Sequence, residues 1–283
     1  MGWPLGYSLS PLMHGWALKA AGLQGEYKEY PVEPSMLELW LGGVVGMGLS
    51  GFNVTMPYKN QVWNWLKNRA KQGQVAPEAD DIGAVNTVVV KNDSLIGYNT
   101  DGEGFLSAFH DAGLDLSGWR VLLLGSGGAA QAIAYALAKR TVVSHLTVWN
   151  RPGALLERAG NLVRLINRVR PAEEFAALST DLEALAVQEY PLIINATPLG
   201  MKGHVEVPET VLKRIHQGQV VYDIVYEPRE TGMIRAARKA GARAITGDVM
   251  LAGQGAVAFE LWTGRQWMQP VMQQALNEHF ARH

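Results

Sequence analysis

Short apolar runs alternate with helical patterns along the second half of the chain. Four apolar runs of strand length lie at residues 121–124, 146–151, 192–197 and 220–225. Segments with small or apolar residues at helical spacing follow them, at residues 128–138, around Val211 and at residues 231–240. Buried strands joined by helices are typical of a parallel sheet. The pattern therefore predicts an α/β domain in this half of the chain.

The first half mixes helices with strands, and the last segment is largely helical. A helix is predicted after Ser10-Pro11, where apolar residues recur at helical spacing, and another follows Lys59. A strand is expected at residues 51–55, and residues 247–283 are expected to form helices. This half therefore predicts a second domain that also contains both kinds of element.

A hairpin organises the polar residues of the first half. Its two strands are predicted at residues 84–91 and 94–99. Asn92-Asp93 between them is a favourable two-residue turn. Pairing across this turn places Asn86 opposite Asn99 and brings Asp101 beside them, so three polar side chains are predicted to converge. A cap for the next helix would also explain Asp101, but it would leave Asn86 unexplained.

Composition limits the classes of function. The chain has 283 residues, 48% hydrophobic and 18% charged, which suggests two globular domains. A formal net charge of −1 without blocks of like charge gives no nucleic-acid footprint and no polybasic membrane patch, so a small-molecule partner is favoured. The absence of cysteine excludes disulfides and thiolate metal sites. With no signal-peptide pattern and no spanning apolar run, we expect a cytoplasmic protein.

A glycine-rich turn follows the first strand of the α/β half. Gly125, Gly127 and Ala130 fit the spacing of a dinucleotide-binding turn. Gly125 would permit the tight turn, Gly127 the approach of a pyrophosphate, and Ala130 the packing of the helix on its strand. A glycine turn that merely joins a strand to a helix is the alternative interpretation.

Polar residues at two helix starts are candidates for chemistry. Ser10 as N-cap and Pro11 at the first helical position explain that pair without a ligand, but they do not explain Ser8. Two hydroxyls at a helix N-terminus can also bind a carboxylate. Lys59 lies in a first helical turn, where the helix dipole disfavours a cation. A solvated surface lysine and a catalytic ammonium both remain open for Lys59.

The end of the second α/β strand bears on the choice of nucleotide. An acidic residue expected there to bind a free ribose 2′-hydroxyl is absent, and Asn150-Arg151 stand in its place. An arginine suits a 2′-phosphate, so this position favours NADP over NAD.

Nine motifs, in order, resemble the shikimate dehydrogenase family. They are GWPLGYSLSP, GFNVTMPYK, GAVNTVV, YNTDG, LLLGSGGAA, WNR, INATPLGM, DIVYEPRET and MLAGQG, and they span nearly the whole chain. The resemblance implies a substrate domain at residues 1–104, a Rossmann-type doubly wound NADP-binding domain at 105–246, and C-terminal helices at 247–283 that return to the first domain. It implies an active site between the domains.

The implied activity is the reversible, NADPH-dependent reduction of 3-dehydroshikimate to shikimate in chorismate and aromatic amino acid biosynthesis. The resemblance assigns the catalytic pair to Lys59 and Asp101. Substrate contacts carry over to Ser8, Ser10, Thr55, Asn86, Tyr226 and Gln254. Cofactor contacts carry over to Gly125, Ser126, Gly127, Gly128, Ala129, Asn150, Arg151, Thr197 and Gly247. No metal, nucleic acid or membrane is implied, and the protein is expected to be a monomer or a homodimer.

The chain departs from the family pattern in places. It begins Met1-Gly2-Trp3-Pro4 where the family has a complete apolar strand, so most of that strand is expected to be missing. Pro152 stands where a threonine often helps to hold the 2′-phosphate, and Arg158 is the candidate for a second basic residue. The alternatives are a quinate/shikimate dehydrogenase that uses NAD and a non-catalytic member that binds substrate or nucleotide as a regulator. Intact Lys59 and Asp101 argue against the regulator.

Overall fold

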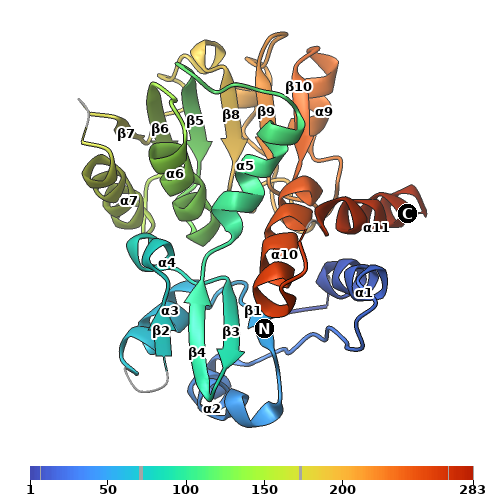
Figure 1. The fold of residues 1–283 in the computed structure, drawn as a ribbon. Coiled ribbons are helices and arrows are strands. Elements are labelled where there is room, and N and C mark those ends of the chain that lie inside the picture. The colour runs from blue at the N-terminus through green and yellow to red at the C-terminus, as the bar shows by residue number, and fades with distance from the viewer. Residues whose placement is uncertain (7, 70–72, 172–173, 267, 283) are drawn as a thin grey trace. The chain divides into compact units, whose positions relative to one another are not determined.

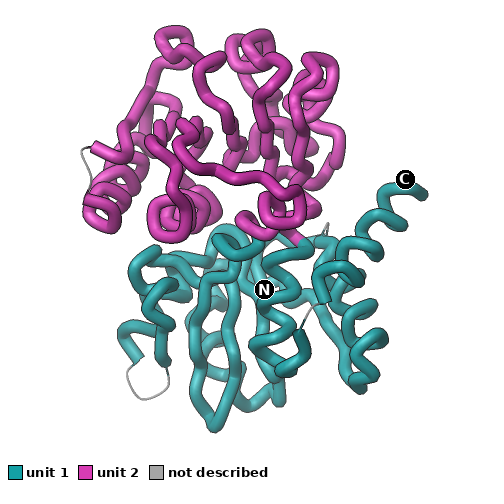
Figure 2. The backbone as a smooth tube through the Cα atoms, turned by 45° about the horizontal axis from the view of Figure 1, so that its top comes forward, with its two compact units in different colours: residues 1–104, 252–283 teal, residues 105–251 magenta. Residues whose placement is uncertain are grey.

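The computed structural model describes residues 1–6, 8–69, 73–171, 174–266 and 268–282. They form two compact units, shown in different colours in Figure 2. Unit 1 consists of Met1–Gly104 and Ala252–His283, and unit 2 of Phe105–Leu251. The described residues contain no helix long and apolar enough to cross a membrane.

Unit 1 is built on a four-stranded mixed sheet in the order β1-β3-β4-β2 (Figure 1). The strands are β1 (Gly51–Asn53), β2 (Gly73–Val75), β3 (Thr87–Lys91) and β4 (Ser94–Tyr98). The helices that begin in the first part of the chain are α1 (Ser10–Ala20), η1 (Pro34–Met36), α2 (Leu37–Gly43), η2 (Val44–Met47), α3 (Lys59–Lys67), α4 (Pro77–Ile82) and α5 (Asp101–Asp111). At the C-terminal end lie α10 (Gly247–Thr263) and α11 (Gln269–Arg282), and α11 packs on α1.

The predicted hairpin is confirmed, including its register. β3 and β4 pair antiparallel with Lys91 opposite Ser94. Asn92 and Asp93 have φ values of +49° and +58°, and positive φ at both central residues defines the turn that suits the twist of a hairpin. At the other end Asn86 N donates to Tyr98 O at 3.0 Å, which extends the ladder to Asn86.

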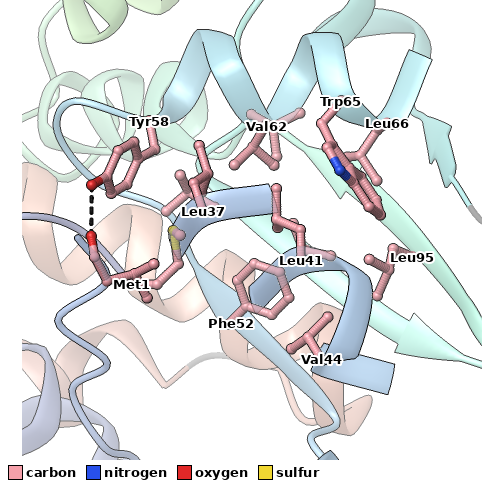
Figure 3. Close-up of a cluster of buried hydrophobic side chains, with 14 of the residues drawn as sticks. Met1, Leu37, Leu41, Val44, Phe52, Tyr58, Val62, Trp65, Leu66 and Leu95 are labelled. Atoms are coloured by element: carbon pink, nitrogen blue, oxygen red, sulfur yellow. Dashed lines mark hydrogen bonds between the residues drawn. The ribbon is translucent and has the colours of Figure 1, made fainter. Parts of the chain in front are cut away.

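The core of unit 1 fixes the start of α3 (Figure 3). Tyr58, the residue before the helix, is fully buried, and its hydroxyl donates to Val32 O at 2.6 Å. Val62 and Leu66, one and two turns further on, are buried in the same cluster. An amphipathic helix with this anchored stripe has little freedom to rotate. The core therefore sets the direction of the next side chain, that of Lys59.

The first residues make isolated backbone contacts. Gly2 forms a single bridge with Pro31. Thr55 N donates to Met1 O at 3.0 Å, and Trp3 N donates to Met56 O at 3.1 Å. Residues 1–3 thus connect two segments of unit 1 through their backbone.

Unit 2 is a six-stranded parallel sheet in the order β10-β9-β8-β5-β6-β7 (Figure 1). The strands are β5 (Arg120–Leu124), β6 (His145–Trp149), β7 (Ala176–Ser179), β8 (Leu192–Asn195), β9 (Val220–Asp223) and β10 (Arg243–Thr246). Between them lie α6 (Gly128–Arg140), α7 (Leu156–Val169), η3 (Val187–Glu189), α8 (Glu209–Leu212) and α9 (Gly232–Lys239). From β5 outward, β6 and β7 lie on one side and β8, β9 and β10 on the other, which is the order of a doubly wound dinucleotide-binding sheet. The predicted α/β class is confirmed.

One predicted helix start is wrong by a residue. α1 begins at Ser10, its N-cap is Leu9, and the cap has no side-chain hydrogen bond. Ser10 is therefore not the N-cap. Instead, Ser8 Oγ accepts the Ser10 N–H at 3.2 Å, and the Ser10 side chain interacts with Tyr27.

Candidate active site

Lys59 and Asp101 form an ion pair in unit 1. Lys59 is the first residue of α3 and Asp101 the first of α5. Lys59 Nζ lies 2.5 Å from Asp101 Oδ2, and the two side chains are 17% and 6% exposed. A solvated surface lysine does not describe this geometry. The Lys59 side chain is mostly buried, and a small part of it remains exposed.

Asn86 holds the second oxygen of Asp101. Its Nδ2 donates to Asp101 Oδ1 at 2.8 Å and to Thr100 Oγ1 at 3.0 Å. Its Oδ1 accepts the backbone N–H of Thr100 at 2.8 Å, which fixes the orientation of the amide. Asn99 Oδ1 accepts the N–H of Asp101 at 3.1 Å. The predicted convergence of the three polar side chains is confirmed, and both Asp101 oxygens act as acceptors.

The hydrogen bonds continue from Asn86 to Asn53, near the sheet edge. Thr87 and Thr100 hydroxyls lie 3.3 Å apart. Asn53 Nδ2 donates to Thr87 Oγ1 at 3.0 Å and to Asn86 O at 3.3 Å, so both of its amide protons are used. Asn53 Oδ1 therefore faces the other way, where it accepts from Tyr27 Oη at 2.8 Å.

Tyr27 connects this network to Ser10, a link that the sequence did not reveal. The Tyr27 hydroxyl proton goes to Asn53, so toward Tyr27 the Ser10 hydroxyl can act only as a donor. Burial is the largest cause of a raised pKa at Tyr27, which keeps the phenol protonated. One chain of contacts thus runs from Ser10 to the Lys59–Asp101 pair.

His14 packs flat against the ring of Tyr27. Their ring centroids are 4.3 Å apart with an interplanar angle of 5°, and Trp262 and Phe259 pack around His14. His14 is 1% exposed, and neither ring nitrogen has a hydrogen-bond partner among the described residues. Burial lowers the pKa of His14 to about 3. The imidazole therefore stays neutral and serves as an aromatic spacer.

Thr55 and Gln254 lie beside this network without joining it through the bonds described above. The Thr55 side chain is exposed, and its backbone pairs with Met1 and Tyr58. Gln254 lies on α10, where a Cβ at Gly104 would come within 2.4 Å of Gln254 N. Only glycine allows that approach, which places Gln254 against the first turn of α5. Ser8, on the other hand, lies two residues before α1 and accepts the N–H of Ser10.

In unit 2 the glycine turn has the shape that the motif predicts at Gly125. Its φ is +107°, and a Cβ would lie 2.9 Å from both Ala196 O and Thr197 Cγ2. Gly127 precedes α6, and a Cβ there would meet no atom within 4 Å. Ala130 is fully buried. The first amides of α6 and open space at Gly127 suit a phosphate group. Gly128 and Ala129 contribute those amides, and Ser126 in the turn is buried.

The end of β6 carries an unpaired donor. Asn150 is 5% exposed, and its Nδ2 is buried with no hydrogen-bond partner among the described residues. An unsatisfied buried amide costs free energy unless a ligand completes it. Arg151 beside it is exposed. The Asn150 amide, Arg151 and open space at Gly127 fit a phosphorylated dinucleotide.

Arg158 lies in the first turn of α7, after the loop that starts at Pro152. Partial burial lowers the pKa of its guanidinium from the ordinary value, which leaves the group charged at neutral pH. It stays the candidate for a second basic residue near Arg151.

Thr197, Tyr226 and Gly247 follow β8, β9 and β10 respectively. In a parallel sheet these ends share the edge at which β5 meets Gly125, and ligands of such sheets bind there. A Cβ at Gly247 would lie 2.3 Å from Ile224 O, so the backbone there is tightly packed. The described residues hold no group of three or more His, Cys, Asp or Glu side chains suited to a metal ion.

Comparisons with known proteins show the family of this chain. Residues 1–88 match the family model of the shikimate dehydrogenase substrate binding domain. The NADP(+) shikimate dehydrogenase of Moorella thermoacetica is 40% identical over 278 residues, covering 98% of this chain and 91% of the relative. The chain belongs to the shikimate dehydrogenase family. The corresponding protein of Geobacter metallireducens is 39% identical over 269 residues, covering 94% of this chain and 90% of its own.

Solved structures of similar proteins have the same fold. A shikimate dehydrogenase in complex with NADP+ has a TM-score of 0.87 at 33% identity and covers 99% of this chain and 93% of its own. The shikimate 5-dehydrogenase of Thermus thermophilus, in complex with NADP(H) and shikimate, has a TM-score of 0.82 at 35% identity, with coverage of 98% and 97%. The quinate dehydrogenase of Corynebacterium glutamicum, in complex with NAD, has a TM-score of 0.85 at 28% identity, with coverage of 98% and 96%.

Proposed function

We propose that this protein catalyses the reversible reduction of 3-dehydroshikimate to shikimate with NADPH, and that Lys59 and Asp101 are its catalytic pair. The observation that carries the assignment is the 2.5 Å ion pair between the first turns of two helices, with Asn86 on the second carboxylate oxygen. The names and sequence identities of the relatives support the reaction.

The proposed role of Lys59 follows from the negative charge that develops on the carbonyl oxygen during hydride transfer. NADPH, when bound, would supply a hydride for the carbonyl carbon. The carbonyl oxygen then gains an electron pair and needs a proton, which Lys59 Nζ donates as a general acid. Asp101 orients the Lys59 ammonium, because its two oxygens accept hydrogen bonds from Lys59 and Asn86. In the oxidation direction the neutral Lys59 amine takes the proton back from the hydroxyl.

The other residues bind and orient. Ser8 and Ser10 bind the substrate carboxylate at the start of α1, where the helix dipole favours an anion. Thr55, Asn86, Tyr226 and Gln254 complete the substrate contacts. The glycine turn, Thr197 and Gly247 hold the dinucleotide, and Asn150 with Arg151 hold its 2′-phosphate.

A steady-state assay of the purified protein tests the proposal. Shikimate and quinate are each offered with NADP and with NAD, and nicotinamide absorbance is followed. We expect turnover with shikimate and NADP to exceed every other combination in kcat/KM. A preference for quinate with NAD would favour the alternative dehydrogenase, and the absence of turnover in all four combinations would favour a binding protein.

A further inference from the structure

Asp223 is a buried carboxylate in unit 2 that neither the glycine turn nor the proposed chemistry uses. It ends β9 and is fully buried. Three donors reach it: Asn195 Nδ2 and Val225 N on Oδ1, at 2.9 and 3.1 Å, and Thr231 Oγ1 on Oδ2, at 2.6 Å. These donors come from three different points of the chain, so one side chain ties them together.

One arm of this arrangement reaches Thr197. The Asn195 amide that donates to Asp223 also donates to Leu199 O at 2.9 Å. Its oxygen accepts both the N–H of Thr197, at 3.1 Å, and the Thr197 hydroxyl, at 2.6 Å. The Thr197 methyl group occupies the space that a side chain at Gly125 would need. The position of Asn195 therefore sets the loop that contacts the glycine turn.

The second arm brackets the loop that carries Tyr226. Val225 N–H bonds to Asp223 just before Tyr226, which makes a local turn of the kind that Asp side chains form. At the far end of the loop the Thr231 hydroxyl donates to Asp223 and also accepts Ile234 N–H as the N-cap of α9. Both ends of this loop thus rest on one carboxylate.

The two loops also contact each other directly. Lys202 N donates to Glu227 O at 3.3 Å, and Ile224 N donates to Asn195 O at 3.0 Å. A shift of Asp223 would therefore move both loops at the carboxyl edge of the sheet.

We infer that Asp223 is a positioning residue for cofactor and substrate: it holds Thr197 through Asn195 and Tyr226 through Val225 and Thr231. It touches neither ligand. The inference rests on the proposed function for its kinetic readout, and its cofactor arm can be measured by binding alone.

The test separates the two arms. Asn195→Ala should raise the Kd for NADP, measured by calorimetry, roughly tenfold and leave KM for shikimate within about twofold, because only the Thr197 loop is released. Thr231→Val should raise KM for shikimate and leave the Kd for NADP within about twofold, since it releases only the far end of the Tyr226 loop. Asp223→Ala should raise both constants, and Asp223→Asn should restore both to within about threefold, because its oxygen can keep the two N–H donors while its amide faces Thr231.

The matched control is Gln219→Ala, at the residue that directly precedes the same strand at its opposite end. Gln219 is 2% exposed and donates to Val187 O and Tyr190 O, so its loss should lower Tm as a buried polar deletion does. Both ligand constants should nevertheless stay at the wild-type values.

The inference is wrong if the folded Asp223→Ala protein, like Gln219→Ala, keeps the wild-type Kd for NADP and KM for shikimate and only its Tm falls. Asp223 would then serve stability alone. If Asp223→Ala does not fold, the opposite selectivity of Asn195→Ala and Thr231→Val decides, and parallel changes in the two variants overturn the inference. A wild-type protein that binds NADP but does not oxidise shikimate contradicts the proposed function and leaves the cofactor arm testable.

Discussion

Each unit buries a hydrogen-bonded polar network, and the two networks end differently. In unit 1 the network from Tyr27 through Asn53 and Asn86 ends at a partly exposed ion pair, Lys59 with Asp101. In unit 2 the network ends at Asp223, which is fully buried and has no cationic partner among its hydrogen-bond donors described above. The first network ends at a partly exposed ion pair, whereas the second ends at a fully buried carboxyl group.

The difference in exposure indicates different roles: proton transfer for the first network and positioning of the chain for the second. An ammonium that stays 17% exposed can exchange a proton with a ligand. A carboxylate without exposure does not touch a ligand, so we expect it to act by holding the chain that does. Deletions in the first network should therefore lower kcat, and deletions in the second should raise binding constants.

Loss of Lys59 gives the largest expected effect. Lys59→Ala should lower kcat by roughly 10²-fold or more with little change in KM for shikimate, as expected when a general acid is removed. Steady-state kinetics with shikimate and NADP measure it.

Lys67→Ala is the control, since Lys67 ends the same helix and pairs with Asp80 on the surface. It should leave kcat unchanged. A near-normal kcat in the Lys59→Ala protein would show that Lys59 is not the general acid. It would also contradict the distinction drawn between the two networks.

Stability should depend on pH in opposite directions through the two units. Folding lowers the pKa of His14 from 6.5 to about 3, so below pH 6.5 protons bind the unfolded chain more tightly, and stability falls as the pH drops. Burial raises the pKa of Asp223 from 3.8 to about 6, so this group stabilises the fold at acid pH, and its contribution is lost as the pH rises through 6. At about pH 5, His14 lowers the free energy of unfolding by about 2 kcal/mol relative to a histidine with its ordinary pKa. Between about pH 5 and 8, the contribution of Asp223 to the free energy of unfolding falls by about 1.4 kcal/mol.

Urea unfolding at about pH 5, 6.5 and 8 checks both signs. His14→Phe, which keeps a ring against Tyr27, should flatten the acid side of the curve, and Asp223→Asn should flatten the alkaline side. If the acid side kept its full slope in the His14→Phe protein, another group would be responsible.

Arg151 gives the smallest effect. Arg151→Ala should raise KM for NADP roughly tenfold and leave kinetics with NAD almost unchanged, because only a contact to the 2′-phosphate is lost. The expected effect is no larger than this because Pro152 offers neither a hydroxyl nor an N–H beside Arg151.

Arg164→Ala, on the exposed face of α7, is the matched loss of charge and should change neither KM. Equal impairment with both nucleotides in Arg151→Ala would contradict the assigned contact.

The sequence predicts those parts of the site that depend on local pattern. The hairpin turn fixes a register, and the register alone places Asn86 beside Asp101. Gly125 is predicted by its spacing to the strand, and its positive φ follows from the same turn. The apolar runs likewise predict four of the six strands of unit 2.

The rest depends on contacts between distant segments. Tyr27 meets Asn53 across 26 residues and Asp223 meets Asn195 across 28, and neither has a local pattern that marks it. The sequence pattern does not predict β7, because its four residues, AALS, lack the β-branched and aromatic residues that mark strands. The helix α7 could have been found, since Ala159, Leu162 and Ile166 recur at helical spacing.

The contact between Ser10 and Tyr27 bears on the proposed binding of the substrate carboxylate at Ser10. The hydroxyl proton of Ser10 already has a neutral acceptor, so any incoming group must replace that acceptor. An ester or an amide would exchange one neutral hydrogen bond, worth about 0.5–1.5 kcal/mol, for another of the same size. A carboxylate gains, because a bond to an ionised acceptor is worth about 1.5–3 kcal/mol. If Ser10 binds the substrate as proposed, its contact with Tyr27 in the free protein favours an anion over the neutral derivatives of the same acid.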